Sequence, residues 1–215
     1  MPKASDVTTV IAGGLGASTF GADLYYSRLC NHLGAVLVKP DRGGFGPIDQ
    51  TYEQFEARMD ELSDHGRKLL VIVGHSLGGI YAVIYAASHP NVLHLVLIGV
   101  PVNGSAWLRL ITYINEIAGQ YAPVLLDLMP GSELLDRFYK SLLQVASISV
   151  CIEARFDLLV MPNGACHVPG ALGYLMLWAP WTNHVTMIGH KRVLAVCSNT
   201  VADAQSIAAR QLASL

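Results

Sequence analysis

The stretch that decides the fold is Leu69–Ser88, which reads LLVIVGHSLGGIYAVIYAAS. Its first part, Leu69–Val73, is an apolar and largely β-branched run of the kind that favours a buried strand. Its last part, Leu77–Ser88, has the length and composition of a helix. Between them stands Gly74-His75-Ser76-Leu77-Gly78, a G-x-S-x-G pattern. A strand, a tight turn and a helix in this order hold a serine above the edge of a sheet.

This context makes Ser76 the candidate nucleophile. The turn forces the serine into a strained backbone conformation, and the glycines two residues before and two residues after it leave room for strand and helix to approach each other. The alternative is the glycine-rich turn of a nucleotide-binding fold, but the chain contains no G-x-G-x-x-G and no acidic ribose ligand placed after one. We therefore predict that Ser76 is catalytic.

Outward from this segment, short apolar runs alternate with helical patterns, which is typical of a parallel sheet with helices on both faces. We predict a single α/β domain over residues 1–215. The predicted strands are Val7–Ala12, Ala35–Val38, Leu69–Val73, Val92–Val100, Ile148–Ile152 and Val185–Ile188. The predicted helices are Ala22–Leu33, Tyr52–His65, Leu77–Ser88 and Lys191–Leu212.

Residues 105–145 break the alternation, because helical segments follow one another there without a strand between them. Their apolar side chains are too many for one buried stripe. We expect a small helical cap over Ser76, with Leu110 and Ile114 in contact with an acyl chain. The alternative is an ordinary core helix buried on two sides.

Composition and charge exclude several classes of protein. Hydrophobic residues make up 52% of the 215 residues and charged residues 14%, which excludes a disordered or coiled-coil chain. The net charge is −2 and no Lys/Arg tract is present, so nucleic acid is not an expected partner. No apolar run reaches the roughly 18 residues of a membrane span.

Other absences set further expectations. The chain shows no signal peptide, so we expect a cytoplasmic protein by default, or a secreted one if a leader has been removed. The four cysteines lack C-x-x-C spacing and the eight histidines lack metal-ligand spacing. We therefore expect buried thiols, no metal and no cofactor. The sequence does not indicate an oligomeric state.

The motifs together resemble the α/β-hydrolase superfamily, and within it the small lipases and esterases. Besides the serine motif, Gly13–Ser18 is similar to the family's oxyanion-hole loop, and Pro40–Gly46 to its loop after the next strand. Met129–Leu135 is similar to a Pro-Gly-Ser turn that is frequent in bacterial triacylglycerol lipases. The likeness spans most of the chain and implies an α/β-hydrolase fold.

A serine hydroxyl needs an imidazole base, and the imidazole needs a carboxylate to hold it. In this fold the chain order is serine, acid, histidine. Asp157 follows a late predicted strand in a segment that resembles the family's D-x-x-V-P, and is the predicted acid, with Glu153, Asp127 and Asp136 as weaker alternatives. His190 follows the last predicted strand and is the predicted base, whereas His184 and His167 are more typical of surface histidines.

The oxyanion that forms during attack needs two preorganised donors. The backbone N–H of Leu77, directly after the serine, is one candidate. The resemblance places the second on Leu15, with Gly14 and Ala17 as alternatives. The alternative is that Gly13–Ser18 is a plain glycine-rich loop without a catalytic role.

We therefore predict a hydrolase that cleaves carboxylic esters through an acyl-enzyme, without a cofactor. Between Asp157 and Lys191 the chain carries no charged residue, and the aromatic run around Trp178 forms an expected wall for acyl chains or an ordinary core segment. The expected partner is a small ester or a lipid, with at most peripheral contact with lipid interfaces. Alternatives are acyl transfer or hydrolysis of thioesters or amides on the same residues, and a non-catalytic binding protein of the same fold.

Overall fold

One parallel sheet forms the centre of the molecule. The computed structural model describes residues 7–17, 20–102, 124–157, 159–160 and 168–214. Within them, six parallel strands pair in the order β2-β1-β3-β4-β5-β6. The carboxyl ends of all these strands therefore meet at one edge of the sheet. The strands are β1 (Val7–Ala12), β2 (Val36–Val38), β3 (Leu69–His75), β4 (Val92–Ile98), β5 (Ser149–Ala154) and β6 (Gly173–Leu177).

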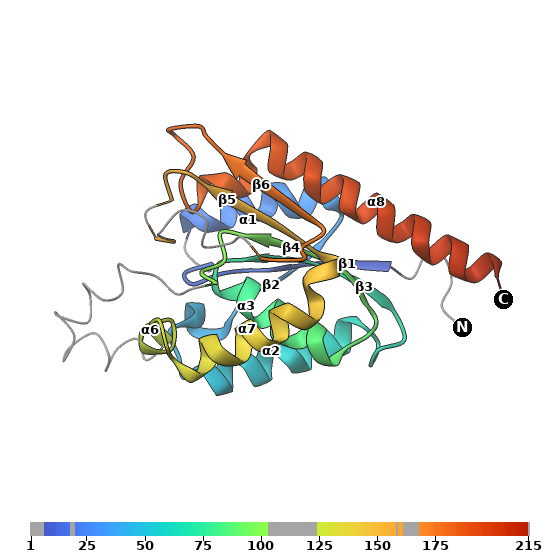
Figure 1. Ribbon diagram of the computed structural model, residues 1–215, viewed down its shortest axis with the longest axis horizontal. Coiled ribbons are helices and arrows are strands. Elements are labelled where there is room, and N and C mark those ends of the chain that lie inside the picture. Colours follow the sequence, from blue (N-terminus) through green and yellow to red (C-terminus); the bar gives the residue numbers. More distant parts are fainter. Residues whose placement is uncertain (1–6, 18–19, 103–123, 158, 161–167, 215) are drawn as a thin grey trace.

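Helices cover both faces of the sheet, as Figure 1 shows. One face carries α2 (Ile48–Leu62), α3 (Leu77–Ser88) and α7 (Glu133–Val145), and the other carries α1 (Phe20–Leu33) and α8 (Lys191–Ala213). The fold class predicted from the sequence is confirmed. The shorter helical segments are α6 (Val124–Asp127) and the 3-10 helices η1 (Asp41–Gly44), η2 (Ala146–Ile148) and η3 (Thr186–Gly189).

The alternating side chains of β3 show how the sheet joins the two helical layers. Leu70 and Ile72 belong to the core cluster that includes α2, α3 and α7. Val71 packs with residues of α8, and Val73 belongs to the cluster formed with α1, η3 and α8. All four side chains are buried, because a parallel strand with helices on both faces has no solvent side.

The segment expected to form a cap is described only in part. Residues 103–123, which include Leu110 and Ile114, lie outside the described residues. The described end of the segment contains α7, which starts after Ser132 and buries Leu135, Phe138 and Leu142 against α3. This end is a helix of the domain core, and the cap over Ser76 stays a prediction.

The strand predicted at Val185–Ile188 is wrong, because Val185 lies in a turn and the next three residues belong to the 3-10 helix η3. The physical reason is the preceding asparagine: the Asn183 side-chain oxygen accepts hydrogen bonds from the N–H groups of Val185 (3.1 Å) and Thr186 (3.0 Å). This local turn outweighs the β preference of the short apolar run. The last described strand is instead β6, which lies within the aromatic segment that the sequence had marked as a wall or core.

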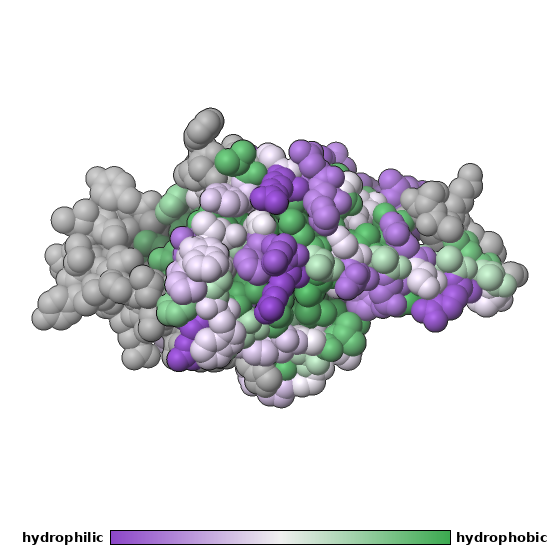
Figure 2. Space-filling view, turned by 90° about the horizontal axis from the view of Figure 1, so that it is seen from above, coloured by the Kyte–Doolittle hydropathy of each residue, from purple (hydrophilic) through white to green (hydrophobic). Residues whose placement is uncertain are grey.

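The outer face over α1 and α8 is mixed in character. Seen from that side, hydrophobic and hydrophilic residues are interspersed (Figure 2). Within the described part of the chain, no helix combines the length and the hydropathy needed to cross a membrane. Cys151 and Cys197 are buried free thiols and Cys30 is a partly exposed one, while Cys166 is outside the described residues.

Candidate active site

Ser76 occupies the turn between β3 and α3 with a backbone conformation that side-chain-bearing residues rarely adopt. Its φ is 54° and its ψ is −126°. The turn closes because glycines permit very short approaches: a Cβ on Gly74 would lie 2.5 Å from Gly79 Cα, and a Cβ on Gly78 would lie 2.3 Å from the carbonyl oxygen of Ala12. Ser76 is thus held at the carboxyl end of the sheet, where its side chain is only partly buried.

Asp157 forms the second part of the site, in the loop that follows β5. Its side chain is 2% exposed, and Oδ2 lies 2.7 Å from His184 Nδ1. Its Oδ1 accepts hydrogen bonds from the N–H groups of Leu159 (2.9 Å) and Val160 (3.2 Å). Because an ionised carboxylate only accepts, the Nδ1 of His184 carries the proton in this pair. In the neutral ring the free lone pair is therefore on Nε2.

The structure brings Asp157 together with His184 and not with His190. His190 stands at the N-terminus of α8, where its Nδ1 accepts a hydrogen bond from the Arg192 N–H at 3.2 Å. Partial burial and the charges of Arg192 and Lys191 lower the pKa of His190. A ring used as a helix cap and facing two cations lacks the carboxylate that would hold a catalytic base. His190 as the partner of Asp157 is therefore corrected to His184.

His184 also lies against the elbow formed by Gly74–Gly78. Its ring centroid is 4.7 Å from that of His75, the residue next to Ser76. Its backbone carbonyl oxygen lies 2.8 Å from His75 Nε2. Neither Ser76 Oγ nor His184 Nε2 makes a hydrogen bond to any described residue. The serine hydroxyl and the ring nitrogen are thus not joined by a hydrogen bond in this structure, and neither is bonded to another described residue; such catalytic bonds are often long before substrate binds.

Two backbone N–H groups are available near the serine as oxyanion donors. In the loop after β1, only Leu15 among residues 13–17 has an N–H with no acceptor in the described part of the chain. The N–H groups of residues 13, 14, 16 and 17 donate to Val38 O (2.9 Å), Tyr26 Oη (2.9 Å), Gly43 O (2.8 Å) and Gly14 O (3.1 Å) respectively. Leu77 begins α3, so its N–H has no intrahelical acceptor.

This loop touches the elbow directly. A Cβ on Gly14 would lie 2.7 Å from Ser76 Cβ and 2.9 Å from the carbonyl oxygen of His75. The neighbouring peptide, which carries the N–H of Leu15, is therefore close to the nucleophile. The alternatives Gly14 and Ala17 already donate elsewhere, which favours Leu15 as the second donor.

Trp178, predicted to contact substrate, lies directly after β6 and is 64% exposed. The Arg155 guanidinium carbon lies 4.9 Å above its ring, and the Arg155 N–H donates to the Leu177 carbonyl oxygen at 2.9 Å. These contacts join the ends of β5 and β6, which carry the loops of Asp157 and His184. Arg155 is therefore engaged with Trp178, and Asp157 with His184.

The structure pairs Asp157 with another histidine than the one predicted, and the sequence held a signal for this pairing. The rule that the histidine follows the last strand holds when β6 is that strand, since His184 is the first histidine after Leu177.

Among the described residues, no group of three or more His, Cys, Asp or Glu side chains could hold a metal ion.

The fold is shared with several lipolytic enzymes of low sequence identity. A structure described under two metagenome-derived lipolytic enzymes, LipS and LipT, aligns with a TM-score of 0.64 at 15% identity, covering 92% of this chain and 94% of that one. Monoacylglycerol lipase of Paleococcus ferrophilus aligns with a TM-score of 0.56 at 14% identity, covering 90% and 93%. A soluble variant of monoglyceride lipase from Saccharomyces cerevisiae aligns with a TM-score of 0.57 at 14% identity, covering 94% and 86%.

At these identities the likeness concerns the fold. A search of curated proteins finds no match. The model of the Alpha/beta hydrolase family matches residues 10–214, nearly the whole length of the chain, and the motifs that carried the resemblance fall within that range. The chain belongs to the α/β hydrolase family.

Proposed function

We propose that this protein hydrolyses carboxylic esters through an acyl-enzyme on Ser76, with His184 as the base and Asp157 as the residue that orients it. The observation that carries the proposal is the 2.7 Å contact between Asp157 Oδ2 and His184 Nδ1 beside a serine with φ 54°. The lipolytic enzymes that share the fold support an ester as the substrate class.

The first half of the reaction acylates the serine. Ser76 Oγ attacks the ester carbonyl carbon while His184 Nε2 takes the hydroxyl proton. Asp157 keeps the other ring proton on Nδ1 and stabilises the imidazolium. The carbonyl oxygen becomes an oxyanion that accepts hydrogen bonds from Leu15 and Leu77 N–H. The C–O bond then breaks, and His184 gives its proton to the leaving alcohol.

The second half repeats these roles with water as the nucleophile. His184 takes a proton from water, the hydroxide attacks the acyl carbon, and the acid leaves while Ser76 regains its proton. No residue beyond the five already named is needed. Transfer to an alcohol or amine would use the same acyl-enzyme with a different acceptor, so the identity of the product separates hydrolysis from transfer.

The test is a series of p-nitrophenyl esters of rising chain length with four proteins: wild type, Ser76→Ala, His184→Ala and His190→Ala. We expect His184→Ala to fall to the residual activity of Ser76→Ala, roughly 10³-fold or more below wild type, because the two residues act as one proton-transfer unit. His190→Ala is the matched control, since it also removes a histidine near the site. It should keep its turnover and lose only the stability of a helix cap.

Three outcomes would contradict the proposal in different ways. A large loss of turnover in His190→Ala with a small loss in His184→Ala would assign the base to His190, as the sequence predicted. No turnover of any of the esters by wild type, together with no labelling of it by a fluorophosphonate, would indicate a binding protein. Formation of transferred ester in place of free acid, measured by product analysis with a short alcohol present, would assign the site to acyl transfer.

A further inference from the structure

We propose that Tyr26 and His75 form a bridge that positions the oxyanion donor and the base relative to Ser76. We call the chain of contacts from Gly14 through Tyr26 and His75 to the carbonyl of His184 the Tyr26–His75 bridge. The inference rests on the proposed function, because the bridge connects three of the four loops to which that function assigns chemistry, those of Leu15, Ser76 and His184. Neither residue touches the reacting atoms, so both are positioning residues.

The bridge is a continuous series of short contacts between buried groups. The Gly14 N–H donates to Tyr26 Oη at 2.9 Å, and Tyr26 Oη lies 2.7 Å from His75 Nδ1. His75 Nε2 lies 2.8 Å from the carbonyl oxygen of His184. Tyr26 is 2% exposed and His75 is 4% exposed, so water does not compete for these bonds.

The chemistry of the partners determines which group donates and which accepts in each hydrogen bond. A carbonyl oxygen only accepts, so His75 Nε2 carries a hydrogen and donates it to His184. In a neutral ring Nδ1 is then an acceptor, and the hydroxyl of Tyr26 must donate to it. The oxygen of Tyr26 in turn accepts from Gly14. Each hydrogen therefore has one acceptor, and only one neutral tautomer of His75 fits.

The titratable groups around His75 agree with a neutral ring. They are the Tyr26 hydroxyl from α1, whose pKa burial raises to about 12, and His184, behind which lies Asp157. Burial and the neighbouring His184 hold the pKa of His75 well below its ordinary value. A charged His75 would repel the imidazolium that His184 becomes during the reaction. A neutral His75 can hold the base loop without opposing that charge.

The consequence for catalysis follows from where the bridge ends. Gly14 immediately precedes Leu15, whose N–H is the proposed oxyanion donor. Without the Tyr26 hydroxyl the Gly14 N–H has no acceptor. The peptide that carries the Leu15 N–H is then held only by the bond from the Ala17 N–H to the Gly14 carbonyl oxygen (3.1 Å), and it can shift. Misplacing a donor weakens the transition state more than the bound substrate. Loss of the bridge should therefore lower kcat and leave KM nearly unchanged.

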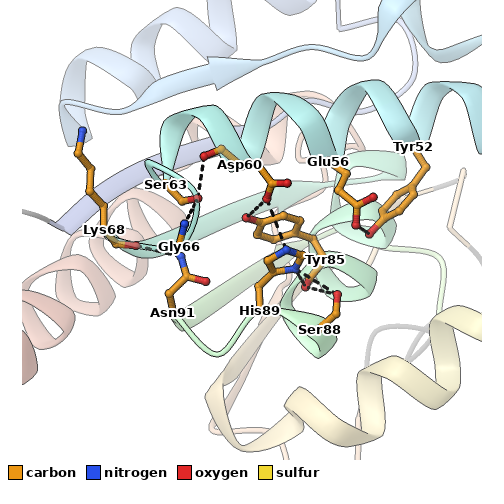
Figure 3. Close-up of polar contacts among 10 residues, drawn as sticks. All are labelled: Tyr52, Glu56, Asp60, Ser63, Gly66, Lys68, Tyr85, Ser88, His89 and Asn91. Carbon is orange, nitrogen blue, oxygen red and sulfur yellow. Dashed lines mark hydrogen bonds and ion pairs between the residues drawn. The ribbon is translucent and has the colours of Figure 1, made fainter.

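The experiment compares Tyr26→Phe with Tyr85→Phe, each of which removes one hydroxyl from a fully packed tyrosine. Tyr85 belongs to a separate network at the far end of α3, where its hydroxyl donates to Asp60 Oδ1 at 3.0 Å (Figure 3). Both variants should lower the melting temperature by similar amounts. We expect Tyr26→Phe to lower kcat by about 10- to 100-fold with KM within about twofold. Tyr85→Phe should keep both constants within about twofold.

A second variant covers the case in which Tyr26→Phe does not fold. His75→Gln can still donate to the carbonyl of His184 but offers no acceptor where Nδ1 was. It should show the same loss of kcat, and combining it with Tyr26→Phe should add little, because both break one bridge. In the wild-type protein, imidazole ¹⁵N spectra should show His75 with its hydrogen on Nε2.

The outcomes separate this proposal from the proposed function. Wild-type protein without turnover or Ser76 labelling would refute the ester hydrolase itself. If wild type is active and Tyr26→Phe has the same kcat, the bridge is refuted and the hydrolase proposal is unaffected. If Tyr26→Phe does not fold, a wild-type kcat of His75→Gln has the same meaning. Spectra with the His75 hydrogen on Nδ1 would also overturn the bridge, whatever the kinetics.

Discussion

At the scale of single residues, one strained backbone position sets up the site. A non-glycine residue in a sparsely populated backbone region costs about 1–3 kcal/mol, so the surroundings must hold it there. The Ser76 N–H donates to the Ile98 carbonyl oxygen at 3.0 Å, and the Ser76 carbonyl oxygen accepts from the Gly79 N–H at 3.0 Å. The first bond ties the elbow to the end of β4 and the second ties it to the first turn of α3, so the neighbouring strand and the helix maintain the strain.

Asp157→Asn tests the role of the carboxylate without removing volume. An amide can still accept from the N–H groups of Leu159 and Val160, so the loop should keep its shape. The amide can also turn its NH₂ toward His184 Nδ1, which would place the ring hydrogen on Nε2, where it cannot accept the serine proton. We expect kcat to fall by roughly 10³- to 10⁴-fold with an unchanged circular dichroism spectrum.

The matched control for that variant is Asp203→Asn. Asp203 Oδ2 lies 3.0 Å from Nε2 of another buried histidine, His94, in a pair between α8 and β4. This change removes a similar charge next to a similar ring and should leave kcat within about twofold. Comparable losses in the two variants would mean that both pairs are structural, and the assignment of Asp157 would fail.

At the scale of elements, the elbow could be predicted because its information is local. Strand, turn and helix follow one another between Leu69 and Ser88, and the glycines that the turn needs are within that stretch. The base could not be placed in this way. It depends on which late segment pairs with β5, and the short run Val185–Ile188 favours a strand as well as Gly173–Leu177 does. The Asn183 side chain favours a turn at this point, because its oxygen accepts from the N–H groups of Val185 and Thr186 at the start of η3.

Gly78→Ala tests how closely α3 must approach the end of β1. The added Cβ would lie 2.3 Å from the carbonyl oxygen of Ala12 and 2.5 Å from that of Gly13, and backbone cannot move aside as a flexible side chain can. We expect a loss of about 1–3 kcal/mol in the free energy of unfolding, or more, measured in urea. Activity should fall as well, since the shift would separate Leu15 from Leu77.

Gly46→Ala is the control for this prediction. A Cβ at Gly46 would meet only Thr51 Oγ1 at 3.5 Å, an ordinary contact. Its free energy of unfolding should stay within about 0.5 kcal/mol of wild type. Equal stability of the two alanine variants would show that the elbow tolerates a wider spacing than the structure has.

At the scale of the whole molecule, the parallel sheet gathers chemistry from distant parts of the chain. The loops after β1, β3, β5 and β6 carry Leu15, Ser76, Asp157 and His184, and they meet because the strands share one direction. The alternation of strands and helices was enough to predict a parallel sheet with helices on both faces, although it placed the last strand at Val185–Ile188 and not at Gly173–Leu177. It was not enough to predict that α7 packs beside α3, because the apolar sequence pattern of a helix is the same whether the helix covers a sheet or a substrate.

The pH dependence of stability is the property of the whole fold that the buried bridge should control. Because the pKa of His75 is lowered in the folded protein, the unfolded chain binds one more proton below the ordinary imidazole value of about 6.5. Stability is therefore fully present above that pH, and the free energy of unfolding should fall by up to about 1.4 kcal/mol per pH unit below it, until the folded-state pKa is reached. The His75→Gln variant has no titratable group at this position, whereas wild type and variant share the His184–Asp157 and His94–Asp203 pairs. Urea unfolding at pH 7.5, 6.5 and 5.5 measures the free energy of unfolding of both proteins. Below pH 6.5 it should fall more steeply in the wild type than in the variant, and above pH 6.5 the two should change in parallel. Equal slopes below pH 6.5 would mean that His75 takes up a proton while the protein stays folded.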